Sequence, residues 1–117
     1  MLEIFTFGKK DGQVINHFDS TCIMTKVINT NGEVRMNCMH LAEGGIIGFH
    51  KAVVPQLLLV VQGEGCVRGN GGETEVSIGD AVFWEKGEGH ETISEKGMMA
   101  IVIEAELLEP AVFMKKK

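Results

Sequence analysis

Glycine recurs at short, nearly regular intervals along this chain, and this spacing constrains the fold more than any other feature. The sequence has 15 glycines and only 2 prolines in 117 residues. Glycine adopts positive φ without steric cost and therefore marks turns. The segments between the glycines are short and rich in β-branched and apolar residues, which is typical of strands. Many short strands separated by regular turns favour an all-β sandwich or barrel.

Several of these segments alternate with a period of two residues. Thr74, Val76 and Ile78 share one face of their segment, as residues of a half-buried strand do. No segment has a helical period longer than one turn. Asn29–Gly32 and Gly69–Gly72 are predicted to be hairpin turns. The predicted strands are Leu2–Phe7, Thr21–Ile28, Glu33–Leu41, Ile46–His50, Gln56–Val61, Cys66–Arg68, Glu73–Ile78, Ala81–Trp84, His90–Ser94 and Met98–Ala105.

Composition and charge argue against several classes of function. The net charge of −5 disfavours nucleic-acid binding, which needs a basic surface. The longest apolar run, Leu57–Val61, is too short to span a membrane, and Met1–Phe7 lacks the features of a signal peptide. The three cysteines are odd in number and widely spaced, which indicates buried thiols in a cytoplasmic protein. They are Cys22, Cys38 and Cys66.

Two histidines and one amide are candidates for a shared site. His50 and Gln56 are an even number of positions apart, so an unbroken pleat points both to the same side, although Pro55 lies between them. His90 begins another predicted strand after a glycine-rich turn. Because one side of every barrel strand faces the interior, these three side chains are expected to meet there. Neutral imidazoles are the commonest metal ligands, and an amide oxygen also serves some cations.

The segment 44–63 resembles the first motif of the cupin family, G-x5-H-x-H-x3-E-x6-G. Every spacing is kept, and the motif positions are Gly44, His50, Ala52, Gln56 and Gly63. The second histidine of the motif is thus an alanine, and its glutamate is a glutamine.

The segment 79–94 resembles the second cupin motif, G-x5-P-x-G-x2-H-x3-N, again with every spacing kept. Its positions are Gly79, Glu85, Gly87, His90 and Ser94. The resemblance implies a single cupin domain over residues 1–117, with a C-terminal extension at 106–117. The expected fold is a jelly-roll β-barrel of two antiparallel sheets. The resemblance to small cupins also implies a homodimer, in which Leu2–Phe7 would pack across the interface.

In cupins, the two histidines and the glutamate of the first motif, with the histidine of the second, usually bind a divalent metal. Here His50 and His90 remain, Ala52 cannot ligate, and Gln56 is a weaker, uncharged ligand. A reduced site of His50, His90 and Gln56 would hold Zn, Ni, Fe or Mn, completed by water or substrate. The other interpretation is a metal-free pair of histidines that hydrogen-bonds an organic ligand, with Gln56 as a buried amide. No motif for a nucleotide or an organic cofactor is present.

Three aromatic residues flank the motifs and are candidates for the apolar wall of a ligand pocket. Core packing is an equally good explanation for each of them. They are Phe49, Phe83 and Trp84.

Two functions remain open from the sequence. In the first, the barrel interior binds a small molecule, with His50, His90 and Gln56 as polar contacts and a divalent metal held weakly if at all. In the second, the protein is a metal-dependent enzyme, an oxygenase, isomerase or lyase, that uses a metal on His50 and His90. The fold does not choose between an enzyme and a binding protein.

Overall fold

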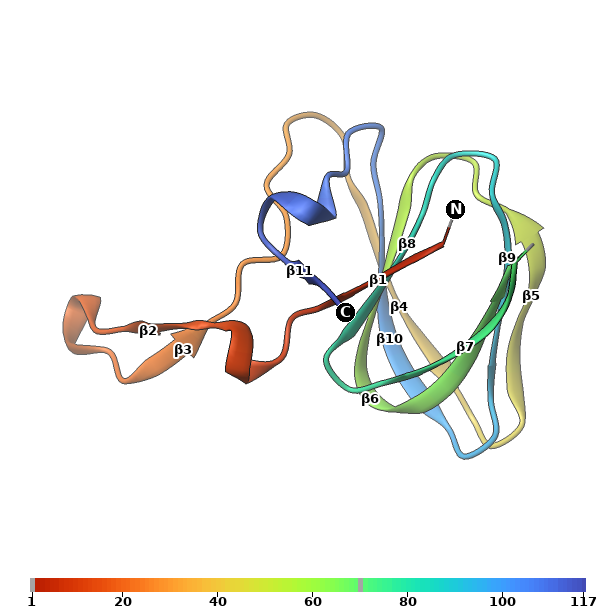
Figure 1. Ribbon diagram of the computed structural model, residues 1–117, viewed down its shortest axis with the longest axis horizontal. Coiled ribbons are helices and arrows are strands. Elements are labelled where there is room, and N and C mark those ends of the chain that lie inside the picture. Colours follow the sequence, from red (N-terminus) through yellow and green to blue (C-terminus); the bar gives the residue numbers. More distant parts are fainter. Residues whose placement is uncertain (1, 70) are drawn as a thin grey trace.

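One long strand, β6, runs through both sheets of the protein (Figure 1). The computed structural model describes residues 2–69 and 71–117. The strands are β1 (Glu3–Thr6), β2 (Gln13–Ile15), β3 (Cys22–Met24), β4 (Arg35–Leu41), β5 (Gly45–Lys51), β6 (Gln56–Gly69), β7 (Gly72–Ser77), β8 (Asp80–Trp84), β9 (Gly89–Ser94), β10 (Met98–Glu104) and β11 (Lys115–Lys116). Three single-turn 3-10 helices are η1 (Lys9–Asp11), η2 (His17–Asp19) and η3 (Pro110–Val112).

The first half of β6 pairs with β8 and β10, and its second half pairs with β7 and β9. One sheet therefore has the order β11-β1-β8-β6-β10-β4, and the other is completed by β5 against β9. The strand pairs among the described residues are antiparallel. This confirms the predicted all-β fold of two antiparallel sheets in a jelly-roll barrel. In the described ranges, no helix is long and apolar enough to cross a membrane.

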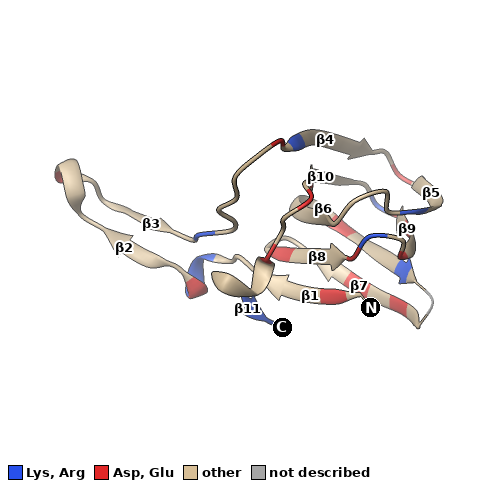
Figure 2. Ribbon diagram, turned by 90° about the horizontal axis from the view of Figure 1, so that it is seen from above, with Lys and Arg blue, Asp and Glu red and all other residues tan. Residues whose placement is uncertain are grey.

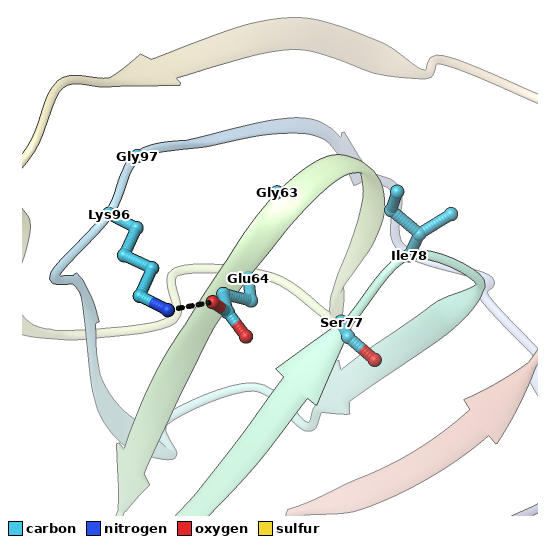
Figure 3. A pocket seen from close by; sticks show the side chains of 6 residues that line it. All are labelled: Gly63, Glu64, Ser77, Ile78, Lys96 and Gly97. Carbon is cyan, nitrogen blue, oxygen red and sulfur yellow. Dashed lines mark ion pairs between the residues drawn. The ribbon is translucent and has the colours of Figure 1, made fainter.

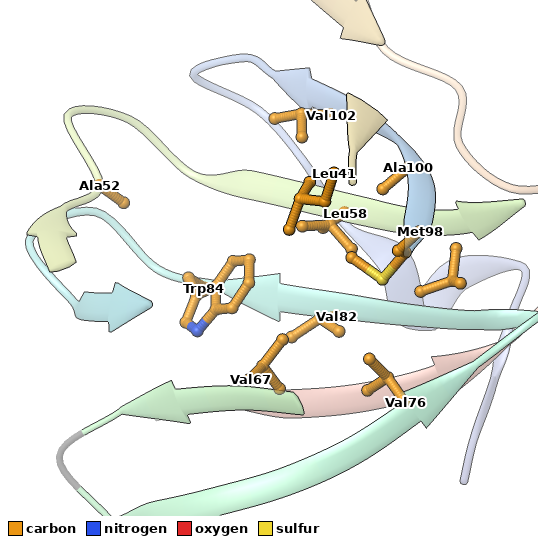
Figure 4. Close-up of a cluster of buried hydrophobic side chains, with 11 residues drawn as sticks. Leu41, Ala52, Leu58, Val67, Val76, Val82, Trp84, Met98, Ala100 and Val102 are labelled. Atoms are coloured by element: carbon orange, nitrogen blue, oxygen red, sulfur yellow. The ribbon is translucent and has the colours of Figure 1, made fainter. Parts of the chain in front are cut away.

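The two faces of the first sheet bury different sets of apolar side chains, as the period of a strand requires. The interior cluster, between the sheets, is drawn in Figure 4 and comprises Leu41, Ala52, Leu58, Val60, Val67, Val76, Val82, Trp84, Met98, Ala100 and Val102. The outer cluster is covered by the C-terminal segment and comprises Phe5, Leu57, Leu59, Ala81, Phe83, Ile103, Ala105, Leu108 and Met114.

Residues 9–24 form an arm that projects away from the barrel (Figures 1 and 2). It holds the two-stranded sheet of β2 and β3. At the tip, Phe18 is fully exposed, and Phe18 and Asp19 both have φ of 58°. Left-handed backbone at two consecutive non-glycine residues carries a steric cost.

Three expectations from the sequence are wrong. The glycines at 63 and 65 do not end a strand, because β6 continues through them with φ of +77° at Gly63. Asn29–Gly32 joins no hairpin, because residues 25–34 form no strand. The thiols are free but not buried, because Cys22 and Cys38 are exposed and Cys66 is half-buried. The hairpin at 69–72 does join β6 to β7 through the pair Gly69–Gly72, and position 70 lies outside the described residues.

Gly63 is the point at which β6 passes from one sheet to the other, and no larger residue fits there. A Cβ at Gly63 would lie 2.2 Å from the carbonyl oxygen of Gly97. We expect Gly63→Ala to lower the free energy of unfolding by about 2 kcal/mol or more, through positive φ and backbone overlap.

The measurement is urea unfolding, with Gly8→Ala as the matched control. Gly8 has φ of −65°, and a Cβ added there would meet no atom within 4 Å. Equal stability of the two variants would show that β6 tolerates a side chain at this bend.

Candidate functional site

Strands β5 and β9 bring the two motif histidines together. His50 and His90 are directly opposite in the antiparallel pair, after a register shift between Ile47 and His50. Their ring centroids are 4.4 Å apart, with the ring planes inclined at 57°. His90, Thr92 and Ser94 are all buried, so this face of β9 points into the barrel. The structure thus brings the two imidazoles together, with His90 buried in the barrel and His50 exposed.

His90 is enclosed by other rings. Its side chain is 2% exposed and stacks on the indole of Trp84, with centroids 4.0 Å apart and planes 20° from parallel. Neither ring nitrogen of His90 has a hydrogen-bond partner among residues 2–69 and 71–117, and the same holds for Nε1 of Trp84. Buried polar atoms are nearly always hydrogen-bonded, so these three nitrogens need partners that the described protein atoms do not supply.

Burial, and secondarily the nearby His50, lowers the pKa of His90 to about 4. The His90 imidazole is therefore neutral near pH 7, with one nitrogen that donates a hydrogen bond and one that accepts. His50 differs because it is exposed, and its Nδ1 lies 2.8 Å from the carbonyl oxygen of Gly48. This contact leaves Nε2 of His50 as the nitrogen available to a ligand.

Gln56 lies at the start of β6, at the same end of the barrel as His50. It is buried, and its register partner on β8 is Trp84. Its Nε2 donates a 3.3 Å hydrogen bond to Glu104, the last residue of β10. The sequence does not single out Glu104 as a site residue. Glu104 is an even number of positions from Met98 in a predicted strand, which indicates only that both face the same side. This spacing does not distinguish a residue that binds a ligand from one that packs in the core.

The three candidate aromatics lie in three different places. Trp84 belongs to the interior cluster and contacts His90. Phe83 points to the other side of β8 and packs in the outer cluster, so the structure does not bring it to the histidines. Phe49 is 59% exposed, and its ring lies over the backbone of Gly89, where a Cβ would be 2.5 Å from Cζ.

The donor set around His50 and His90 does not match the four-ligand metal site that the motifs imply. The position of the second histidine is Ala52, which is buried in the interior cluster. In the part of the chain that the structure describes, no group of three or more histidine, cysteine, aspartate or glutamate side chains is placed to hold a metal. Two imidazoles and the amide oxygen of Gln56 remain, which is a weak and uncharged set.

Two hollows on the surface lie away from the histidines. The smaller, of about 370 Å³, lies beside the ion pair of Lys96 with Glu64 (Figure 3), whose atoms are 3.6 Å apart. The larger, of about 800 Å³, follows the outward side chains of β6 and β7, including Cys66 and Arg68. Neither is lined by a histidine or an amide of the candidate site.

Comparison with known proteins places the fold. Residues 37–105 match the model of the cupin domain family. No curated protein sequence matches the chain. Among solved structures, a cupin superfamily protein from Desulfitobacterium hafniense superimposes with a TM-score of 0.60 at 14% identity, over 72% of this chain and 75% of that one.

Two further similar structures bear the names of enzymes. A predicted oxalate decarboxylase from Thermotoga maritima has a TM-score of 0.58 at 24% identity, over 62% of this chain and 65% of that one. A salicylate 1,2-dioxygenase from Pseudaminobacter salicylatoxidans has a TM-score of 0.59 at 22% identity, over 72% of this chain and 24% of that one. At such identities the likeness establishes the fold alone.

The family match covers both motifs and the strands that carry His50, Gln56 and His90, and the topology agrees with it. The chain belongs to the cupin domain family and is a small cupin with an incomplete set of the family's usual metal ligands.

Proposed function

We propose that this cupin binds a small organic molecule between its two sheets, at the histidine pair. The observation that carries the proposal is the set of buried nitrogens without partners, on His90 and Trp84. Each buried polar group left unsatisfied costs about 1–3 kcal/mol, which a ligand with matching groups recovers. The site therefore favours a ligand that hydrogen-bonds at this point.

The surrounding side chains indicate which chemical groups the ligand carries. Trp84 only donates a hydrogen bond, whereas neutral His90 donates one and accepts one. Leu58, Val102 and Leu41 supply an apolar wall nearby. A small molecule with an apolar part and one or two hydrogen-bonding atoms suits this interior.

The alternative is a metal-dependent enzyme that holds a divalent ion on His50, His90 and Gln56. The ligand set supports it less well, because Ala52 and Gln56 replace two of the family's usual ligands. Metal analysis of protein purified without a metal-affinity tag separates the two proposals. We expect less than one equivalent of metal, and no change in metal content in the His50→Ala, His90→Ala variant.

Fluorescence of Trp84, the single tryptophan of the chain, reports on the same site. In a panel of small metabolites, we expect a binder that changes this emission in metal-free protein and loses affinity at least tenfold in the His90→Phe variant. His40→Phe, on the exposed side of β4, is the control. One stoichiometric metal that disappears with the two histidines would instead support the enzyme.

The neutral state of buried His90 also predicts how stability depends on pH. The pKa of His90 is lowered from 6.5 to about 4 in the folded protein. Between these values the unfolded chain binds a proton and the folded chain does not, so stability is full above pH 6.5 and falls as the pH is lowered towards 4. The loss amounts to as much as about 3 kcal/mol.

Urea unfolding at pH 7 and pH 4.5 measures this loss. The His90→Gln variant should lose distinctly less stability between the two pH values than the wild type, and His40→Gln should lose as much as the wild type. An identical pH dependence in both variants would contradict a buried, neutral His90.

We also propose that the protein forms a homodimer in which the arm of one chain packs on the second copy. Leu2–Phe7, expected from the sequence to pack across the interface, does not suit this role, because β1 pairs with β8 and β11 of its own chain. Phe18 is fully exposed and Val14 is 77% exposed on the arm, and Met36 is 65% exposed on the outer face of β4, an edge strand. A two-stranded hairpin is marginally stable by itself, and unpaired edges recruit other strands. Each chain carries both the arm and the exposed edge of β4. In a dimer with twofold symmetry, the arm of each chain can therefore cover β4 of the other.

Light scattering coupled to gel filtration tests the dimer. The wild type should have the mass of two chains, and the Val14→Ser, Phe18→Ser variant the mass of one. Ile78→Ser removes an apolar side chain outside the arm that is 66% exposed, and should leave the dimer intact. A monomeric wild type would overturn the proposal.

A further inference from the structure

The interior face of β4 carries a charged residue at the histidine end of the barrel. Arg35 is directly opposite Glu104 in the β4–β10 pair, and Leu41 is opposite Met98. Leu41 and Met98 are both in the interior cluster, so even spacing puts Arg35 on the same face of β4. Arg35 is exposed, which places it at the open end of this face.

The nearest expected partner of Arg35 is engaged elsewhere. The Glu104 carboxylate accepts the hydrogen bond from Gln56, on the strand at the other side of β10. Within residues 2–69 and 71–117, Arg35 makes no ion pair or side-chain hydrogen bond. Its guanidinium is therefore a free cation with several donors at the entrance to the interior.

Arg35 and the histidine pair lie at the same end of the barrel. Gln56 begins β6 only five residues after β5 ends at Lys51. Its register partner on β10 is Glu104. The register of β10 then places Arg35 next to Glu104. On the other side of β6, in the same sheet, the register of β8 places Trp84 opposite Gln56, and Trp84 stacks on His90. An entering molecule thus meets Arg35 at the rim and His90 with Trp84 inside.

We propose that the ligand of this site is a small organic acid whose carboxylate is bound by Arg35. This inference rests on the proposed function and specifies its ligand class. A planar guanidinium binds a carboxylate through two parallel hydrogen bonds, which a neutral amide does not reproduce. Where the acid has a further oxygen, as the keto oxygen of pyruvate, the N–H of Trp84 and one nitrogen of His90 donate to it, while the apolar wall contacts the carbon skeleton of the acid.

The test uses four acids, each against its own primary amide: acetate, pyruvate, butyrate and benzoate. Binding is followed by Trp84 fluorescence and by the shift in melting temperature. We expect at least one acid to bind ten times or more tightly than its amide. Arg35→Gln should weaken that acid about 10- to 100-fold, as the loss of charge-assisted hydrogen bonds does, and leave amide binding unchanged.

Arg68→Gln is the matched control, because Arg68 is the other arginine of the chain and pairs with Glu73 and Glu91 on the outer side of β6. It should bind the acid as the wild type does. Arg35→Lys, which keeps the charge but not the fork of donors, should fall between the wild type and Arg35→Gln.

The outcomes separate this inference from the function beneath it. Suppose that amides bind as tightly as their acids and that both lose affinity in His90→Phe. This result would overturn the assignment of the ligand as an acid but would support the interior site. An acid that binds Arg35→Gln as tightly as the wild type would likewise overturn the role of Arg35. If neither acids nor amides bind, the assignment of the ligand as an acid is overturned. The metabolite panel then tests separately whether the interior site binds any small molecule.

Discussion

A neutral imidazole buried against an indole is the contact on which the account of this protein depends. His90 stacks on Trp84 and faces His50, yet its two nitrogens and the indole nitrogen lack partners in the described chain. In an apolar interior, such an arrangement costs several kcal/mol unless something else supplies the hydrogen bonds. The unmet hydrogen-bonding groups are the basis of the proposed ligand site, and the lowered pKa of His90 follows from the same burial.

Strand β6 belongs to both sheets and so holds the two residues of this contact, Trp84 and His90, in place. Its first half places Gln56 beside Trp84, and its second half pairs with the strand that carries His90. The bend at Gly63, where the carbonyl oxygen of Gly97 lies too close for any side chain, lets one strand serve both sheets. Binding chemistry and barrel closure are thus set by the same segment.

Much of the fold could be predicted from the sequence because glycine spacing and period-two alternation are local signals. The convergence of His50 and His90 could also be predicted, from the spacing of the two motifs. The assumption of an unbroken pleat from His50 to Gln56 is wrong, because β5 ends at Lys51 before Gln56 begins β6. The continuity of β6 could not, because glycine at a bend and glycine at a turn look alike in sequence. The roles of Glu104 and Arg35 depend on register between strands far apart in the chain, which a single sequence does not encode locally.

The aromatic candidates illustrate the same limit. Trp84 and Phe83 are neighbours in sequence, so strand alternation sends them to opposite faces, and only the register with β6 decides which face is the interior. The arm could not be predicted either, because most apolar residues of 13–24 lie exposed, which apolar residues in a short strand rarely do. Such exposure is expected where a second molecule completes the packing.

The most direct measurement is a crystal structure of the purified protein at a resolution that shows bound water. We expect the rings of His90 and Trp84 to lie between the sheets with the ring of His50 facing them, and a water molecule, an ion or an organic molecule to be hydrogen-bonded to His90. A His90 ring that points out of the barrel, or one whose nitrogens are both satisfied by protein atoms in a dry interior, would contradict it.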